Sequence, residues 1–200
     1  MPRRKTCRKF YKDLRDGMSQ ELVTAISEQI CEKVLASAEY EAAETIFGYY
    51  PLGNEVNCLP ILEQALLDGK QVVLPRTEHD CQMDFYEIHS LDDVEEGNFH
   101  VMEPKPACKR FLPFPYETKN TLVKENDCAV VLVPGVVFDY QGNRYGYGKG
   151  YYDRYFARFG HLKRIALAYI EQMSIEPLEC LETDKKMHII VTEIGIIRIG

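Results

Sequence analysis

The sequence lacks the cysteine spacing of a zinc site or of a disulfide-rich domain. It contains seven cysteines, an odd number, and no two of them are separated by only two residues. Small secreted domains held by disulfides usually have an even number of cysteines, and zinc sites usually contain close pairs. We therefore interpret the thiols as reduced and mostly buried, as is typical of a reducing compartment.

Long apolar runs are also missing. No stretch approaches the ~18 consecutive apolar residues that a membrane-spanning helix needs. The basic N-terminal segment, residues 1–15, is not followed by an apolar core, so it does not resemble a secretory signal. The acidic residues Asp13 and Asp16 are unusual in a transit peptide. We expect a cytoplasmic protein that has no membrane partner.

An excess of positive charge is absent. Thirty-one acidic and 24 basic side chains give a formal net charge of −7. A general nucleic-acid binder needs an electropositive surface, so we expect no nucleic-acid partner, although local binding of an anion remains compatible with this charge. The 200 residues contain no repeat or low-complexity segment, and 46% are hydrophobic. These values predict one globular domain over residues 1–200.

Hydrophobic periodicity predicts alternating helices and strands. After Ser19, a suitable N-cap, apolar residues recur every four positions from Leu22 to Val34 and indicate a helix. A second helix is expected at residues 59–67, with proline in its first turn and Gly69 beyond its end. Four prolines indicate an extended loop between residues 89 and 126. The expected strands cover residues 45–50, 71–74 (stopped by Pro75), 83–88, 128–133, 164–170 and 189–199.

This alternation predicts an α/β fold. We expect a single-domain three-layer arrangement, with a central, largely parallel sheet flanked by helices.

One segment has the composition of an anion-binding site. Gly146, Gly148 and Gly150 alternate between a buried strand and a predicted helix, and ligands of open α/β sheets bind at such positions. Backbone N–H groups of a glycine-rich loop can bind an anion at the helix N-terminus. Arg144 and Lys149 add positive charge, which suits a polyphosphate.

Asp153, in the first turn of that helix, is able to hold a divalent cation that bridges phosphates. The spacing is not a Walker A loop, because Asn143 stands at the first glycine position and Gly150 follows Lys149 where a hydroxyl residue is required. It is not a Rossmann fingerprint either, because the pattern is G-x-G-x-G. A flexible loop, with Asp153 complementing the helix dipole, remains an open alternative.

The same segment resembles a known family. Residues 134–139 read PGVVFD and residues 142–154 read GNRYGYGKGYYDR. Both are similar to the signature of the 5-formyltetrahydrofolate cyclo-ligases, also called methenyltetrahydrofolate synthetases. Shorter matches follow in the family's order: RKTCR at 4–8, GNEVN at 53–57, LPR at 74–76, MEP at 102–104, TD at 183–184 and VTE at 191–193.

The resemblance implies an activity. It is the ATP- and Mg²⁺-dependent cyclisation of 5-formyltetrahydrofolate, with or without a polyglutamate tail, to 5,10-methenyltetrahydrofolate. ADP and phosphate are released after phosphoryl activation of the formyl oxygen. Nothing in the sequence resembles a coiled-coil seam, and a monomer is taken as the default and not as a deduction.

The resemblance also implies roles for particular residues. Lys149 and Arg144 are the implied catalytic residues, and Asp153 and Asp184 are the implied magnesium ligands. The implied ATP-binding residues are Arg4, Lys5, Arg8, Arg144, Tyr145, Gly146, Tyr147, Gly148, Lys149, Gly150, Tyr151 and Tyr152. The implied substrate-binding residues are Tyr50, Glu55, Tyr147, Gly148, Lys149, Gly150 and Tyr151.

The sequence departs from the family pattern at a few positions. Arg4 stands in place of a lysine, Cys7 in place of a leucine, and His188 where a second carboxylate is usual. Without the resemblance, the charges near the N-terminus, Glu55 and Asp184 also fit a solvated surface. Two alternatives stay open: a non-catalytic phosphate- or RNA-binding relative of the same fold, and a small ATP-dependent ligase or kinase with another acceptor.

Overall fold

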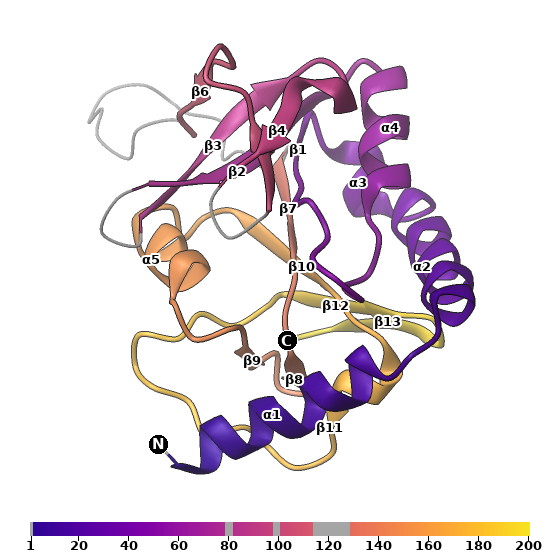
Figure 1. The fold of residues 1–200 in the computed structure, drawn as a ribbon, viewed down its shortest axis with the longest axis vertical. Helices are drawn as coiled ribbons and strands as arrows, with labels where there is room; N and C mark the ends of the chain where they lie inside the picture. The colour runs from indigo at the N-terminus through magenta and orange to yellow at the C-terminus, as the bar shows by residue number, and fades with distance from the viewer. Residues whose placement is uncertain (1, 79–81, 98–100, 114–128) are drawn as a thin grey trace.

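A central eight-stranded sheet organises the computed structural model, which describes residues 2–78, 82–97, 101–113 and 129–200 (Figure 1). Its strand order is β13-β12-β10-β7-β1-β2-β3-β6. The five inner strands run parallel to one another: β1 (Thr45–Phe47), β2 (Gln71–Thr77), β7 (Ala129–Val133), β10 (Lys163–Leu167) and β12 (Ile189–Thr192). The antiparallel strands are β3 (Met83–Ile88), β6 (Arg110–Phe111) and β13 (Gly195–Arg198), and β6 and β13 form the two edges of the sheet.

Alternating side chains give this sheet two buried faces. In β7, Val130 and Leu132 belong to one apolar cluster, whereas Val131 and Val133 belong to the other. Helices α2 (Gln20–Leu35) and α4 (Leu59–Leu67) cover the first face, and α5 (Tyr151–Arg158) covers the second (Figure 1). Because both faces are covered, the central strands are mainly apolar, as in the all-apolar β7 (AVVLV). The predicted largely parallel α/β architecture is confirmed.

Local signals place the helix boundaries as predicted. The Ser19 hydroxyl accepts a hydrogen bond from the Leu22 N–H at 3.3 Å and caps α2. Helix α4 has a proline in its first turn and ends at Leu67, followed by Gly69 at φ +72°. The short helix α3 (Ala38–Ala42) was not expected.

Helix α1 (Pro2–Asp16) is the largest element missing from the sequence-based prediction. It runs beside a small second sheet of order β11-β8-β9, formed by Met173–Ser174, Val137–Asp139 and Arg144–Tyr145 (Figure 1). Cys7 and Tyr11 of α1 pack against the buried residues of β8 and β9. A 3-10 turn at Ile170–Gln172 also contacts α1. The N-terminal segment is therefore part of the fold.

The proline-based predictions were partly wrong. Strand β2 does not stop at Pro75 but continues to Thr77, because its parallel pairing with β1 ends at Val73 and only β3 pairs with it beyond that point. A proline is tolerated where a strand has a neighbour on one side only. The expected loop contains the 3-10 turn Leu91–Asp93 and the strands β4 (Val94–Glu96), β5 (Met102–Pro104) and β6.

Two predicted strands are shorter than expected. Strand β1 ends at Phe47 rather than residue 50, and β10 ends at Leu167 rather than residue 170. Residue 128, the expected start of β7, lies outside the described residues, as does the part of the predicted loop from 114 to 126.

Five cysteines lie in the described part of the chain, and all are unpaired, as predicted. Only Cys31 and Cys58 are buried, Cys7 and Cys108 are partly buried, and Cys180 is exposed, so the prediction of mostly buried thiols was wrong for the described cysteines. Cys81 and Cys128 lie outside the described residues. None of the helices in the described ranges has the length and apolar character that crossing a bilayer requires.

Helix α4 provides a matched test of the core. Leu62 is 0% exposed, whereas Leu67 on the same helix is 81% exposed. We expect Leu62→Ala to lower the free energy of unfolding by about 2–5 kcal/mol, because it leaves a cavity in the core. Leu67→Ala should change it by less than about 0.5 kcal/mol. Urea denaturation of both variants measures this difference, and equal losses would contradict the packing described.

Candidate active site

A cavity of about 940 Å³ opens between α1, the loop that follows β9, and the strands β2 and β5. It contains every residue implied by the resemblance except Lys5 and Tyr145. The implied residues that line it are Arg4, Arg8, Tyr50, Glu55, Arg144, Gly146, Tyr147, Gly148, Lys149, Gly150, Tyr151, Tyr152, Asp153 and Asp184.

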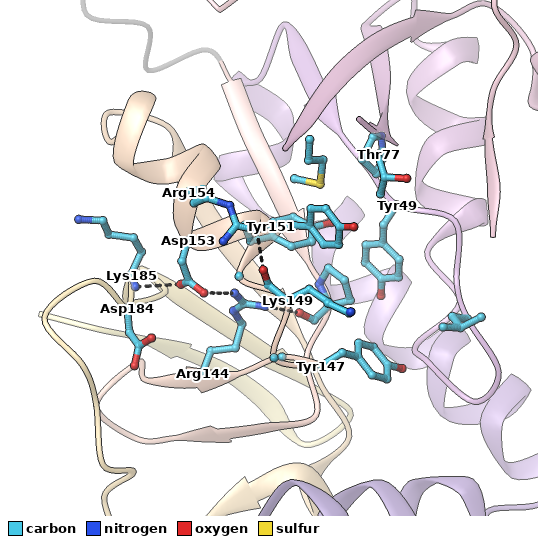
Figure 2. A pocket seen from close by; sticks show the side chains of 18 of the residues that line it. Tyr49, Thr77, Arg144, Tyr147, Lys149, Tyr151, Asp153, Arg154, Asp184 and Lys185 are labelled. Carbon is cyan, nitrogen blue, oxygen red and sulfur yellow. Dashed lines mark hydrogen bonds and ion pairs between the residues drawn. The ribbon is translucent and has the colours of Figure 1, made fainter. Parts of the chain in front are cut away.

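The two ends of the cavity differ in character. Arg144, Asp153, Asp184 and Lys185 gather at one end, whereas aromatic Tyr49 lies near the other (Figure 2). The first end therefore suits a phosphate chain and its cation, and the second suits a planar organic group.

The glycine loop needs glycine for two different reasons. Gly150, the residue before α5, has φ +70°, a conformation that side chains with a Cβ rarely adopt. At Gly146, a Cβ would lie 2.9 Å from Nη1 of Arg144, so any larger residue would displace that guanidinium. The loop thus brings the N-terminus of α5 and a buried cation to the same wall of the cavity.

Arg144 and Asp153 form the polar core of the cationic end of the cavity, where Asp184 and Lys185 also lie. The Arg144 guanidinium is 5% exposed, donates to the Pro134 carbonyl at 3.1 Å, and lies 3.5 Å from Oδ2 of Asp153 (Figure 2). The other oxygen of Asp153 accepts from the Lys185 N–H at 3.1 Å. These contacts fix the Asp153 carboxylate beside the cavity, at the first turn of α5.

Helix α1 supplies two further cations. Nη2 of Arg4 lies 2.7 Å from Oδ2 of Asp184, which also accepts from the Leu181 N–H at 2.8 Å. The guanidinium carbons of Arg4 and Arg8 lie 4.4 Å and 5.4 Å from the ring centre of Tyr145. Tyr145 therefore supports the two arginines from behind by cation–π contact, although it does not line the cavity.

Lys5, the third cation of residues 4–8, is exposed and does not line the cavity. It lies one position past Arg4 on the helix, so it faces a different direction. The structure does not bring it to the other predicted site residues.

The GNE turn at residues 53–55 lies at the opposite end of the cavity, where hydrogen bonds hold Asn54 and Glu55 in place. The Asn54 side-chain amide donates to the carbonyls of Arg15 and Met18 at 3.1 Å and 3.0 Å, so it caps the C-terminus of α1. Glu55 is 5% exposed, and its Oε2 accepts from the Leu52 N–H at 3.0 Å. Burial raises the pKa of Glu55 above its ordinary value, against the opposing effects of the Leu52 N–H and of Arg15.

Two short sequence markers meet at the wall formed by β2 and β5. Nε of Arg76 donates to the Pro104 carbonyl at 3.0 Å. Oε1 of Glu103 accepts from both the N–H and the hydroxyl of Thr77, at 3.0 Å and 2.7 Å. The LPR and MEP sequences are therefore joined to each other, and Thr77 and Glu103 line the cavity.

Several other lining residues were not predicted from the sequence. Tyr49, Met83, Arg154 and Lys185 line the cavity without any spacing signal in the sequence. Tyr49 precedes a residue that was predicted, and its hydroxyl donates to the Val56 carbonyl at 2.7 Å. Arg15 was missed as well, although it is 3% exposed and supports the cavity from behind.

His188, which stands where the family usually has a second carboxylate, does not line the cavity. Its Nδ1 accepts from the Arg164 N–H at 3.0 Å, and its Nε2 lies 2.7 Å from Nη2 of Arg164. Burial, followed by the charges of Arg164 and Lys163, lowers its pKa from 6.5 to about 4. The histidine is therefore a neutral structural residue in this fold.

Asp153 and Asp184 are the two lining carboxylates that were predicted to bind the metal ion. No cluster of three or more histidine, cysteine, aspartate or glutamate side chains suited to a metal ion occurs within the residues that the structure describes. Magnesium commonly uses one or two carboxylates and takes its other ligands from phosphates and water. Asp153 and Asp184, which are 25% and 16% exposed, fit that limited role.

The fold and the cavity define an α/β protein in which a glycine-rich loop with cationic neighbours lies beside aromatic side chains. A family model described as the 5-formyltetrahydrofolate cyclo-ligase family matches residues 1–193, so the chain belongs to that family of ligases.

Curated relatives and solved structures agree with this assignment. A probable 5-formyltetrahydrofolate cyclo-ligase from Caenorhabditis elegans is 28% identical, covering 93% of this chain and 90% of its own length. The 5-formyltetrahydrofolate cyclo-ligase of Saccharomyces cerevisiae is 28% identical, covering 98% of both chains. The NMR structure of Aquifex aeolicus 5,10-methenyltetrahydrofolate synthetase superposes with a TM-score of 0.79 at 28% identity, over 98% of this chain and 92% of that one.

The His188 environment predicts a pH dependence of stability. Below about pH 6.5 the unfolded chain protonates this histidine, whereas the folded chain does so only near the lowered pKa of about 4. The free energy of unfolding should therefore fall as the pH falls between these values, and His188→Gln should remove that part of the loss. Urea midpoints of both proteins at about pH 7.5 and about pH 5 measure it. An identical fall in the two proteins would show that His188 does not cause it.

Proposed function

We propose that this chain catalyses the ATP- and Mg²⁺-dependent cyclisation of 5-formyltetrahydrofolate to 5,10-methenyltetrahydrofolate, with release of ADP and phosphate. The observation that carries the proposal is that one cavity has both a cationic end and an aromatic end that bears a carboxylate. A reaction between a nucleotide and a folate needs both ends in one space, so that the reacting groups meet.

The cationic end is suited to the triphosphate. Arg4 and Arg8 approach it from α1, and the loop over residues 144–152 supplies the backbone of the anion site. Lys149 lies on that loop and lines the cavity, so we assign it the neutralisation of the phosphoryl group in transfer. Phosphoryl transfer depends on positioning and charge neutralisation more than on a protein nucleophile.

The aromatic end is suited to the folate. The lining residues Tyr50, Tyr147 and Tyr151 offer ring faces for a planar group. Glu55 offers a buried carboxylate, which is a strong acceptor for the N–H donors of a pterin ring.

The proposed chemistry has two steps. The formyl oxygen attacks the γ-phosphorus of ATP, the bond to the β-phosphate oxygen breaks, and ADP leaves. Folate N10 then attacks the activated formyl carbon, N10 loses its proton, and the former formyl oxygen leaves as phosphate. An amide-like oxygen is a poor leaving group until it is phosphorylated, which explains the need for ATP. The chain binds both reactants, orients them and balances the phosphate charge.

Magnesium bound beside the phosphates supplies further charge neutralisation. Asp153 and Asp184 are the residues that would hold it, directly or through water. Their present contacts with Arg144, Lys185 and Arg4 keep both carboxylates turned to the phosphate end.

The second candidate function is a non-catalytic phosphate- or RNA-binding relative. The net charge of −7 disfavours RNA, because the positive charge of the cavity is local. Ultraviolet absorbance of methenyltetrahydrofolate, followed with ATP, Mg²⁺ and 5-formyltetrahydrofolate, separates the two. Folded protein that forms no ATP-dependent product would refute the enzyme.

Lys149 gives the sharpest single test of the assigned roles. We expect Lys149→Ala to lower kcat by about 10²- to 10³-fold, a typical cost of removing one positioned charge or donor from a reacting centre. Lys186→Ala is the matched control, because Lys186 is exposed and does not line the cavity. Thermal melting verifies that both variants fold. Near-normal turnover of Lys149→Ala would refute its role.

The magnesium assignment predicts a change in metal requirement. Asp153→Asn and Asp184→Asn should each raise the Mg²⁺ concentration needed for half-maximal turnover severalfold, because each removes a charged oxygen donor. Glu182→Gln loses the same charge at an exposed lining residue that has no assigned metal role. A shift in all three variants would show a general charge effect in place of metal binding.

A further inference from the structure

We propose that Arg15 is a positioning residue for the folate end of the cavity. It holds the Tyr147 ring and the Glu55 carboxylate where a planar substrate bearing N–H donors meets them. The inference rests on the proposed function, because it assigns the aromatic end to the folate.

Arg15 belongs to the face of α1 that is turned to the site. Arg4, Arg8, Tyr11 and Arg15 are separated by four, three and four positions, so they form one stripe along the helix. Arg4 and Arg8 reach the cavity at the phosphate end, and Arg15 lies two turns further on. One helix therefore carries separate cations toward the two ends of one cavity.

Arg15 is buried, and hydrogen bonds hold its guanidinium in place. Its guanidinium is 2% exposed, donates to the Tyr147 hydroxyl at 2.6 Å, and donates to the Gly135 carbonyl at 3.2 Å. The central carbon of the guanidinium, Cζ, lies 5.7 Å from the centre of the Tyr147 ring. Tyr147 is 46% exposed and lines the cavity, so this buried anchor restricts a side chain that solvent would otherwise leave mobile.

Glu55 is the buried carboxylate that compensates this cation. Its Oε1 lies 3.8 Å from Nη1 of Arg15, which is too far for a hydrogen bond but close enough for strong attraction in a buried site. Oε1 is buried and receives no hydrogen bond of ordinary geometry from the described residues, although the Tyr147 hydroxyl is close enough to the Glu55 carboxylate to lower its pKa. A buried acceptor without a donor is costly, so a donor from a molecule in the cavity would complete it.

The charge of Arg15 also favours the ionised form of Glu55. Burial raises the pKa of Glu55, and Arg15 is one of the groups that oppose this rise. The other titratable groups that face Glu55 are Arg144, Tyr147, Tyr49, Cys58, Tyr152 and Tyr169. Burial raises the pKa of each of these tyrosines and of the thiol, so none of them changes charge in acid.

The test compares Arg15→Met with Lys9→Met. Both remove one positive charge from α1, but Lys9 is 77% exposed and pairs with Asp13 on the same helix. We expect Arg15→Met to raise KM for 5-formyltetrahydrofolate about tenfold or more, the effect of losing one charge-assisted contact. KM for ATP should change by less than about twofold, because additivity holds for distant sites. Lys9→Met should change neither.

The pH profile separates positioning from a purely structural role. Without Arg15 the pKa of Glu55 rises further, so the acid limb of kcat/KM for the folate should move to higher pH. Arg15→Lys restores the charge and should return the limb toward its original pH. Tyr147→Phe should raise KM for the folate, and the Arg15→Met/Tyr147→Phe double variant should be less impaired than the product of the two single effects.

The outcomes of these measurements separate positioning of the folate end from a purely structural role of Arg15. Equal rises in both KM values would mean that Arg15 only anchors α1, and that would overturn the proposal, as would an unmoved acid limb. If the wild type gives no turnover, the proposed function fails separately. Calorimetric titration of wild type and Arg15→Met with 5-formyltetrahydrofolate then tests Arg15 alone. Equal affinity, or no binding by the wild type, overturns it.

Discussion

The docking of helix α1 is the constraint on which the rest of the site depends. The helix is fixed at its C-terminal end, where the Asn54 amide takes up its free carbonyls. It is fixed along its length by packing against the small second sheet. Because the chain is rigidly helical between these contacts, the positions of its arginines are set relative to the glycine loop. Removing either attachment would separate the cations from the loop that they face.

The main sheet positions the parts of the cavity that face helix α1. Strand β7 ends at Val133, and the chain then passes through β8 and β9 into the glycine loop and α5. Carboxyl ends of parallel strands gather at one edge of a sheet, where backbone N–H groups and the start of a helix are available to an anion. The GNE turn follows β1, the neighbour of β7, so both halves of the cavity come from adjacent strands.

Local patterns made much of this predictable from the sequence. The helix over 59–67 was placed correctly, because proline and glycine mark its two ends. The glycine loop was recognised from its residue types, and nearly all implied residues line one cavity. Helix α1 was not predicted: its composition is strongly polar, and its apolar contacts are few. Its stability depends on distant partners that periodicity does not reveal.

The same cause explains why other residues of the site were not predicted from the sequence. Arg15 contacts Gly135 and Tyr147, which lie 120 and 132 positions away along the chain. In the sequence it is one basic residue in a basic segment, with nothing to distinguish it from Lys12, which pairs on the surface with Asp16. Thr77 and Glu103 are joined across 26 positions by the meeting of β2 and β5. Contacts of this kind follow from topology, which local residue spacing does not specify.

The net charge has a physical consequence at this site. An acidic protein repels polyanions over most of its surface, and screening limits that repulsion to about 10 Å at ordinary salt. In contrast, the cationic side chains of Arg4, Arg8, Arg144 and Lys149 all line one cavity. Under the proposed function, a triphosphate would therefore gain attraction only after it enters, whereas an extended nucleic acid would meet the acidic exterior as well. The same distribution that disfavours a long polyanion thus suits a single nucleotide.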